Sequence, residues 1–156
     1  MTTSMESWQP PQWWFRNKRP PNDDVYFENM SRVIFQAGLN WAVVDKKWSA
    51  IKEAFCGFKI DKVVHLADED IAKMLKNPEI IRHKGKIQAI IQNAKNFHAI
   101  GKIYGSFQLY LENIDKSNNY AIVIKDLIRK FKWLGTSSAS TFLYTVGENI
   151  NLWEHE

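Results

Sequence analysis

Cysteine is almost absent from this chain of 156 residues, which contains only Cys56. A single cysteine excludes an internal disulfide framework and a cysteine-rich zinc site. No apolar run approaches the roughly eighteen residues that a membrane-spanning helix needs. The first residues also lack the basic segment followed by an apolar core that marks a signal peptide. We therefore expect a soluble, cytoplasmic protein with no membrane partner and no bound metal.

Several motifs of catalytic and nucleotide-binding proteins are absent too. The chain has no Walker loop and no GxGxxG segment, which excludes the nucleotide hydrolysis and dinucleotide binding that depend on them. Its four histidines lack HExxH spacing, and nothing resembles a nucleophile elbow. A dispersed Ser-His-Asp arrangement stays open at this stage. We expect no cofactor.

Aromatic residues, by contrast, are abundant: they make up 13% of the chain and include seven tryptophans. Because a buried indole N–H needs a hydrogen-bond partner, this excess indicates a stacking or binding surface. The net charge is +4, from 21 basic and 17 acidic residues. This mild basic bias is compatible with a polyanionic partner and does not prove one.

Apolar residues recur at helical spacing along most of the chain, and no segment shows sustained period-two alternation. The sequence therefore predicts an all-α fold, a compact helical domain. We expect helix caps at Asn22 or Asp23, at Asn40 and at Asp68, with Lys86 on an exposed helix face. The predicted helices cover residues 24–35, 41–55, 60–66, 68–75, 79–101 and 107–111, followed by a pair joined near residue 135.

The first 24 residues are rich in proline, tryptophan and basic groups. Proline this dense forbids a regular helix, so we expect an extended arm packed on a helical domain of residues 25–156. The aromatics of the arm would lie across the domain or line the mouth of a pocket. A flexible, tag-like end is the alternative.

The segment 131–147, FKWLGTSSASTFLYTVG, reads as the end of one helix, a tight turn and the start of another. We expect Gly135 to adopt a left-handed conformation and Thr136, Ser137 or Ser138 to cap the second helix. The free N–H groups of such a turn favour an anion such as a DNA phosphate. An ordinary αα-hairpin is the alternative. The candidate phosphate-binding residues are Lys132, Leu134, Gly135, Thr136 and Ser137.

Three longer segments occur in order along the chain: FQAGLNW at 35–41, IIRHKGKIQAIIQNA at 80–94 and FKWLG at 131–135. Together they resemble the constitutive (type I) 3-methyladenine DNA glycosylase family, and the similarity runs from about Phe27 to Gly147. The resemblance implies a helix–hairpin–helix glycosylase fold in which residues 134–136 dock on DNA. It also implies a DNA repair enzyme that hydrolyses the N-glycosidic bond of an alkylated adenine flipped out of double-stranded DNA. We expect a prokaryote-like, nucleoid-associated monomer.

The resemblance also implies roles for individual residues. By position, Gly38 and Leu39 enter the DNA stack, Trp41 forms a wall of the base pocket, and Gln36 lies at the same turn. The catalytic candidates are Glu28, Gln36 and Trp41. The further pocket candidates are Trp13, Trp14, Phe15 and Val33.

The chain departs from the family pattern in its metal site and its pocket. The family's Cys/His zinc site has no counterpart, because no histidine precedes His65, and we expect the aromatic arm to pin the terminus instead. The family places a base-recognising Glu where this chain has Val33, which cannot accept a hydrogen bond. Glu28, on the same predicted helix, is the candidate replacement. Related glycosylases use an Asp after the hairpin, where this chain has only Glu148 and Glu154.

These departures leave three hypotheses open. The first is a monofunctional glycosylase for alkylated purines with a changed pocket, which would suit a neutral or differently substituted base. The second is a non-catalytic helix–hairpin–helix DNA-binding protein derived from a glycosylase. The third is an unrelated helical interaction protein.

Overall fold

The computed structural model describes residues 9–152 of the chain. Residues 1–8 of the predicted arm and Glu154 lie outside the described residues. Between residues 9 and 152 the chain contains helices and no strand, which confirms the predicted all-α class. The helices are α2 (Asp23–Gln36), α3 (Trp41–Ala54), the 3-10 helix η1 (Cys56–Phe58), α4 (Ile60–Val63), α5 (Asp68–Leu75), α6 (Lys84–Tyr104), α7 (Phe107–Glu112), α8 (Ser117–Lys130) and α9 (Thr136–Thr145).

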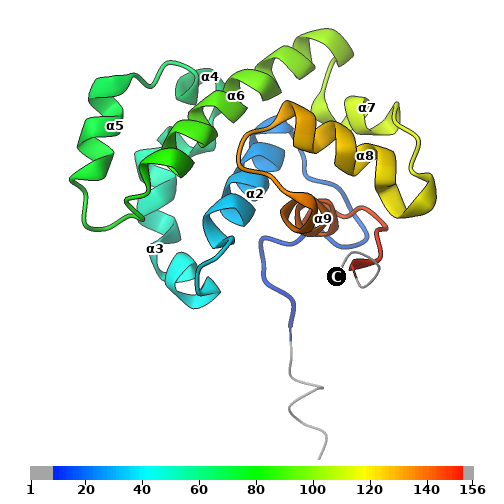
Figure 1. Cartoon of the computed structure of the whole chain (residues 1–156), viewed down its shortest axis with the longest axis horizontal. Coiled ribbons are helices and arrows are strands. Elements are labelled where there is room, and N and C mark those ends of the chain that lie inside the picture. Colours follow the sequence, from blue (N-terminus) through cyan, green and yellow to red (C-terminus); the bar gives the residue numbers. More distant parts are fainter. Residues whose placement is uncertain (1–8, 153–156) are drawn as a thin grey trace, which may run out of the picture.

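Helix α2 lies at the centre of the molecule. It contacts α3, α4, α6, α7 and α9. Figure 1 shows the long helix α6 running across the molecule, with α3 to α5 toward one end and α7 and α8 toward the other. The first and last described segments lie together beside the end of α9. The α2–α3 connection and the first turns of α9 line one cavity.

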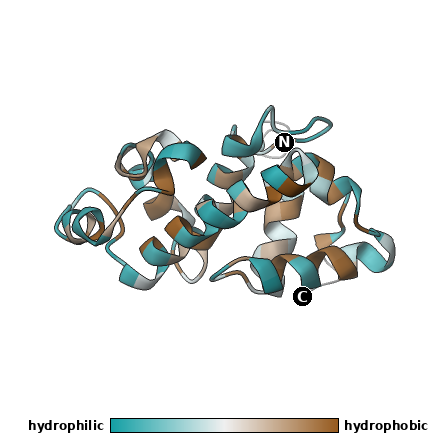
Figure 2. Cartoon of the chain, turned by 90° about the horizontal axis from the view of Figure 1, so that it is seen from above, coloured by the Kyte–Doolittle hydropathy of each residue, from teal (hydrophilic) through white to brown (hydrophobic). Residues whose placement is uncertain are grey.

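Aromatic and aliphatic side chains from α2, α6 and α7 fill the core. The rings of Phe27 and Phe97 lie 5.6 Å apart between α2 and α6, and those of Phe97 and Phe107 lie 4.6 Å apart between α6 and α7. All three rings are fully buried, and each such ring contributes about 1.5–3 kcal/mol by leaving water. Figure 2 shows hydrophobic and hydrophilic residues alternating along α6, as expected of a helix with one face on this core.

Two helices begin where the sequence predicts. The side chain of Asn22 accepts the N–H of Val25 at the start of α2, and that of Asn40 accepts the N–H of Ala42 at the start of α3. Each cap satisfies an N–H group that has no partner within its helix.

Two other predicted helix starts are wrong. Helix α6 begins at Lys84 and not at residue 79, because the Nδ1 atom of His83 accepts the N–H of Lys86 and caps the helix there. Asp68 is the first residue of α5 and not its cap. The cap position is Ala67, whose N–H donates to the carboxylate of Asp70 at 2.8 Å.

The described part of the arm lies against α2 and α9. The N–H of Phe15 donates to the carbonyl of Thr145 at 2.7 Å, and the amide of Asn29 donates to the carbonyl of Trp13 at 3.1 Å. The indole of Trp14 stands edge-on to the ring of Tyr144, 5.5 Å away. The division of the chain near residue 24 stays a prediction.

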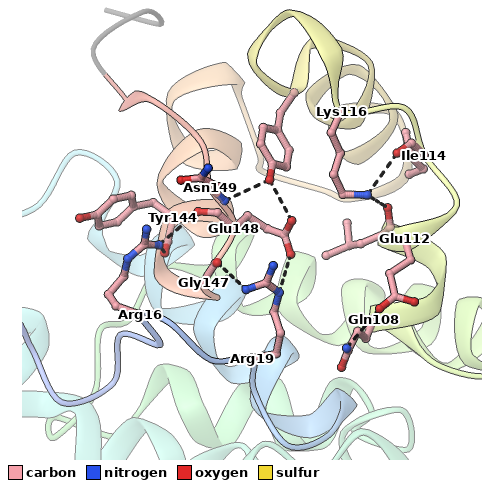
Figure 3. Close-up of polar contacts among 12 residues, drawn as sticks. Arg16, Arg19, Gln108, Glu112, Ile114, Lys116, Tyr144, Gly147, Glu148 and Asn149 are labelled. Carbon is pink, nitrogen blue, oxygen red and sulfur yellow. Dashed lines mark hydrogen bonds and ion pairs between the residues drawn. The ribbon is translucent and has the colours of Figure 1, made fainter.

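Two arginines of the arm bind the end of α9 and the segment that follows it (Figure 3). The Nε atom of Arg19 lies 3.0 Å from the carboxylate of Glu148, and the guanidinium also donates to the carbonyl of Gly147. Arg16 lies over the ring of Tyr144 and donates to the carbonyls of Tyr144 and Glu148. The hydroxyl of Tyr120, from α8, donates to the same carboxylate at 3.1 Å. Cations of the arm thus hold the two ends of the described chain together.

Candidate functional site

A cavity of about 230 Å³ lies where the α2–α3 turn faces the start of α9. Residues of the turn form one wall: Val33, Gln36, Ala37, Gly38, Leu39 and Trp41. The first turns of α9 form the other wall, through Ser137, Ser138 and Thr141. Folding therefore brings the FQAGLNW segment and the predicted hairpin, which are far apart in the sequence, to a single site.

The turn between α2 and α3 presents apolar side chains to solvent. Gly38 has a φ of +77°, in the left-handed region that favours glycine, and the N–H of Leu39 donates to the carbonyl of Gln36. Leu39 is 42% exposed and Trp41 is 44% exposed. Large apolar side chains exposed side by side at a cavity mouth are typical of a binding surface.

Lys86 braces this turn from the inside of the molecule. Its ammonium donates to the carbonyl of Ala37 at 2.7 Å and to that of Phe35 at 3.3 Å. The residue is only 4% exposed, so the prediction that it faces solvent is wrong. Burial lowers the pKa of Lys86 from its usual 10.5. The lysine ties α6 to the end of α2 and fixes the position of the turn.

Gln36 is a buried polar residue without a partner. It is 3% exposed, and neither its amide nitrogen nor its amide oxygen has a hydrogen-bond partner among the described residues. Val33, one turn earlier on α2, is also buried and lines the cavity with it. None of the described residues that line the cavity has an ionisable side chain.

Glu28, the predicted replacement for the missing pocket carboxylate, does not line the cavity. Its carboxylate accepts the indole N–H of Trp48 at 2.9 Å and lies 3.2 Å from the ammonium of Lys52. These contacts join α2 to α3 and occupy both carboxylate oxygens.

The arm aromatics predicted for the pocket, Trp13, Trp14 and Phe15, do not line the cavity either. The guanidinium of Arg32 lies 4.7 Å from the ring of Trp13, which packs on α2. The other two contact Tyr144 and Thr145, one turn of α9 away from the cavity residue Thr141. The described part of the arm, residues 9–24, contacts the helices of the site without forming a wall of the cavity.

The turn between α8 and α9 differs from its prediction in backbone conformation. Gly135 is extended, with φ and ψ of −100° and −175°, whereas Trp133 takes the left-handed conformation with a φ of +61°. Gly135 is itself the N-cap residue of α9, so Thr136, Ser137 and Ser138 are helical residues and not the cap. The predicted conformation of Gly135 and the predicted cap are both wrong.

Asn93 of α6 holds this turn in place. Its side chain accepts the N–H of Lys132 at 2.7 Å and donates to the carbonyl of the same residue at 3.1 Å. The indole of Trp133 packs over Gly85, where an added Cβ would lie 2.8 Å from the ring. Leu134 is buried, which anchors the turn to the core.

The N-terminus of α9 is open. No described side chain caps it, and a Cβ added at Gly135 would meet no described atom within 4 Å. The N–H groups of Thr136, Ser137 and Ser138 have no acceptor within the helix, because the first such bond is from Ala139 to Gly135. Such a helix end favours an anion. Ser137 and Ser138 also line the cavity, so the two features adjoin.

Larger hollows, of about 460, 530, 370 and 280 Å³, lie elsewhere on the molecule. The first contains Asp23 and Asp24, whose carboxylates accept the N–H groups of Phe107 and Ile60 and so cap helices. Burial raises the pKa of Asp23, and the hydrogen bond from Phe107 opposes this effect. Of these five hollows among the described residues, only the one of about 230 Å³ is lined by residues of the FQAGLNW segment, so it remains the candidate site.

Sequence reasoning missed four residues of the site region. Lys86 and Asn93 position the two turns, Trp133 takes the strained conformation of the hairpin, and Thr141 lines the cavity. The resemblance offered a signal for the first three, because Lys86 and Asn93 lie in the 80–94 segment and Trp133 in FKWLG. Thr141 lies outside the three segments.

No group of three or more His, Cys, Asp and Glu side chains within residues 9–152 could hold a metal ion. None of the helices in this range combines the length and the hydropathy needed to cross a bilayer.

Comparisons with known proteins agree with the resemblance. The family model for methyladenine glycosylase matches residues 11–143. A DNA-3-methyladenine glycosylase of Haemophilus influenzae is 37% identical over 85 residues, which are 54% of this chain and 46% of that protein. DNA-3-methyladenine glycosylase 1 of Escherichia coli is 30% identical over 130 residues, covering 72% of this chain and 70% of that protein.

The fold is shared with solved structures of the same kind. A crystal structure of a variant of 3-methyladenine DNA glycosylase I in complex with 3-methyladenine superposes with a TM-score of 0.77 at 25% identity. The match covers 94% of this chain and 91% of that one. The chain therefore belongs to the methyladenine glycosylase family and, with it, to the DNA repair glycosylases.

Proposed function

We propose that this chain is a monofunctional glycosylase that releases an alkylated purine of the 3-methyladenine kind from double-stranded DNA. The observation that carries the proposal is the pairing of an uncapped helix end with a cavity that opens between Leu39, Trp41 and Ser138. A protein that extracts a base needs a phosphate anchor, a plug for the vacated stack and an aromatic wall for the flipped base. The site offers a residue for each task.

The phosphate anchor is the start of α9. The N–H groups of Thr136 and Ser137 are free of helical partners, Gly135 leaves room for close approach, and Lys132 is exposed beside them. Backbone N–H groups bind phosphate regardless of base sequence. The hairpin would therefore position the protein on DNA without selecting a sequence.

The plug and the wall come from the α2–α3 turn. Leu39 protrudes beside Gly38 and would enter the stack as the base leaves it, which offsets part of the few kcal/mol that unstacking costs. The flipped base would lie in the cavity against the indole of Trp41. The cavity of about 230 Å³ is smaller than the roughly 300 Å³ at which sites for drug-sized ligands begin, which suits one base.

The reaction needs little help from the protein when the base is already cationic. A water oxygen bonds to C1′ of the deoxyribose, the bond from C1′ to the base nitrogen breaks, and its electron pair neutralises the departing base. The water proton is released to solvent. Because no described cavity residue is ionisable, positioning and exclusion of solvent supply the catalysis, and no side chain protonates the base.

The non-catalytic alternative is not favoured, since the space beside Val33 and Trp41 is open and not packed solid. We further propose that the protein acts on duplex DNA as a monomer, at the nucleoid. Glu28 would have no part in the chemistry, because both of its oxygens are engaged between α2 and α3.

The test is chromatography of the bases that purified protein releases from methylated genomic DNA, with duplex binding measured in parallel. Release of 3-methyladenine is the expected result. Glu28→Gln serves as a control and should release the same bases per folded molecule. Duplex binding without release of any methylated base would overturn the proposal and favour the non-catalytic alternative.

A further inference from the structure

Resting on the proposed function, we propose that Gln36 is the residue that recognises the flipped base, by pairing its side-chain amide with the N6–N7 edge of an adenine. The family places a base-recognising carboxylate at the position of Val33. In this chain a neutral amide on the same helix would recognise the base. The consequence is selection by hydrogen-bonding pattern and not by charge.

The first support is the unpartnered amide itself. Four described residues contain buried side-chain atoms that lack a hydrogen-bond partner: Trp14, Tyr26, Arg32 and Gln36. Of these four, Gln36 alone lines the cavity, and it alone has two side-chain atoms without a partner, the amide nitrogen and the amide oxygen. A buried polar pair without partners is rare in folded proteins because it weakens the fold. The amide is covered as it stands, and a turn of the Gln36 side chain toward a base in the cavity would bring both atoms to partners.

The second support is the match between the amide and one base edge. A glutamine side chain accepts through its oxygen and donates through its nitrogen, which fits the N6 amino group and N7 of adenine in a bidentate pair. An adenine alkylated at N3 keeps both groups. A guanine alkylated at N7 keeps neither, because its O6 is an acceptor and its N7 is blocked.

The third support is the absence of a competing charge. None of the described residues lining the cavity is ionisable, and the carboxylate of Glu28 is engaged by Trp48 and Lys52. The buried ammonium of Lys86 lies nearby and donates to the carbonyl of the cavity residue Ala37. Since 3-methyladenine and 7-methylguanine are both cationic within DNA, charge cannot separate them in this cavity, whereas the base edge can.

The test uses DNA that contains both lesions. Gln36→Met keeps the length of the side chain and removes both polar atoms. We expect it to release 3-methyladenine about tenfold to a hundredfold more slowly than wild type in single turnover, with duplex affinity unchanged. The ratio of released 3-methyladenine to 7-methylguanine should fall in the same proportion. An unchanged rate and ratio would overturn the role of Gln36 while leaving the proposed function in place.

A second readout does not depend on catalysis. Wild-type protein should bind free 3-methyladenine in a calorimetric titration, and Gln36→Met should lose that binding while melting at the same temperature as wild type or above it. Gln36→Glu keeps an acceptor for N6 and loses the donor for N7, so it should bind with intermediate affinity. Equal binding by all three proteins would overturn the inference, whether or not bases are released from DNA.

Discussion

The Nε atom of Arg19 lies 3.0 Å from a carboxylate oxygen of Glu148, which is buried just beyond α9. The other oxygen of that carboxylate accepts the hydroxyl of Tyr120 at 3.1 Å. Gly147, beside it, has a φ of +90°, and an added Cβ would lie 2.2 Å from the carbonyl of Lys18. The arm and the end of α9 are therefore joined by a buried charge and by a close backbone approach. From the sequence, we expect the aromatic residues of the arm to pin the terminus. In the structure the ion pair between Arg19 and Glu148 contributes to that task.

Replacing Arg19 by Met should destabilise the fold, because it removes the cation that faces a buried carboxylate. The Arg19 side chain is 40% exposed, so water softens the loss, and we expect about 1–3 kcal/mol in the free energy of unfolding by urea. Arg129→Met is the matched control, since that arginine pairs with Asp126 while being 76% exposed and should cost at most about 0.5 kcal/mol. Equal losses of the free energy of unfolding in the two variants would contradict a stabilising role for the ion pair between Arg19 and Glu148.

Two tyrosines should respond oppositely to loss of the hydroxyl. The hydroxyl of Tyr26 is buried without a described partner, so Tyr26→Phe should leave the free energy of unfolding unchanged or raise it by up to about 1 kcal/mol. Tyr120→Phe removes a hydroxyl that bonds Glu148 and the N–H of Asn149, and should cost about 1–3 kcal/mol. Urea titrations of the two variants check this prediction. A larger loss in the free energy of unfolding for Tyr26→Phe than for Tyr120→Phe would contradict it.

The same tyrosines predict how stability depends on alkaline pH. Burial, and next the charge of Glu148, raises the pKa of both Tyr26 and Tyr120 above the usual 10.0. Above about pH 10 the unfolded chain releases phenolic protons that the folded chain retains, so stability should fall as pH rises. Urea midpoints measured across that range should fall less steeply in Tyr26→Phe. An equal slope in the variant would contradict this account.

Gly135→Asp should separate the stability of α9 from its binding to DNA. Because Gly135 is extended and faces open space, an aspartate fits there and can cap the helix, which should stabilise the fold by about 0.5–1 kcal/mol. The same carboxylate would repel a phosphate and so weaken duplex binding. The slope of log affinity against log salt concentration should become shallower by about one, as expected for the loss of one phosphate contact. Gly135→Asn is the control, capping equally without the charge. Unchanged duplex affinity in Gly135→Asp would refute the anchor.

Leu39→Ala and Trp41→Ala should reduce base release more than duplex affinity. Stacking of a base on an aromatic side chain is worth about 1–3 kcal/mol, so we expect single-turnover release to slow by about tenfold to a hundredfold. Val43→Ala is the control. Val43, in the first turn of α3, is as exposed as Leu39 and Trp41 but does not line the cavity. Base release at the wild-type rate by both variants would contradict the roles of Leu39 as the plug and Trp41 as the wall.

The sequence predicted the features that local chemistry determines. The caps at Asn22 and Asn40 and the all-α class follow from side chains that act on their own neighbours. The start of α6 differs from its prediction because Ile80 and Ile81 continue the apolar spacing, although His83 caps the helix and it begins at Lys84, five residues later than predicted.

The site was predicted in position but not in its details. The resemblance identified the two segments that meet at the cavity, yet the engagement of Glu28 by Trp48 and Lys52 depends on how α2 packs against α3. Burial of Lys86 against the carbonyl of Ala37 likewise depends on contacts between distant segments. No local pattern records such contacts.

Entry of the base into the cavity between the Gly38–Leu39 turn and α9 is tested most directly by filling that cavity. Ser138→Phe places a ring in it, and Ser138→Ala is the matched control that leaves it open. We expect Ser138→Phe to bind methylated duplex DNA as wild type does, to melt at a similar temperature and to release no 3-methyladenine, while Ser138→Ala remains active. Release of 3-methyladenine by Ser138→Phe at the wild-type rate would contradict the proposed site.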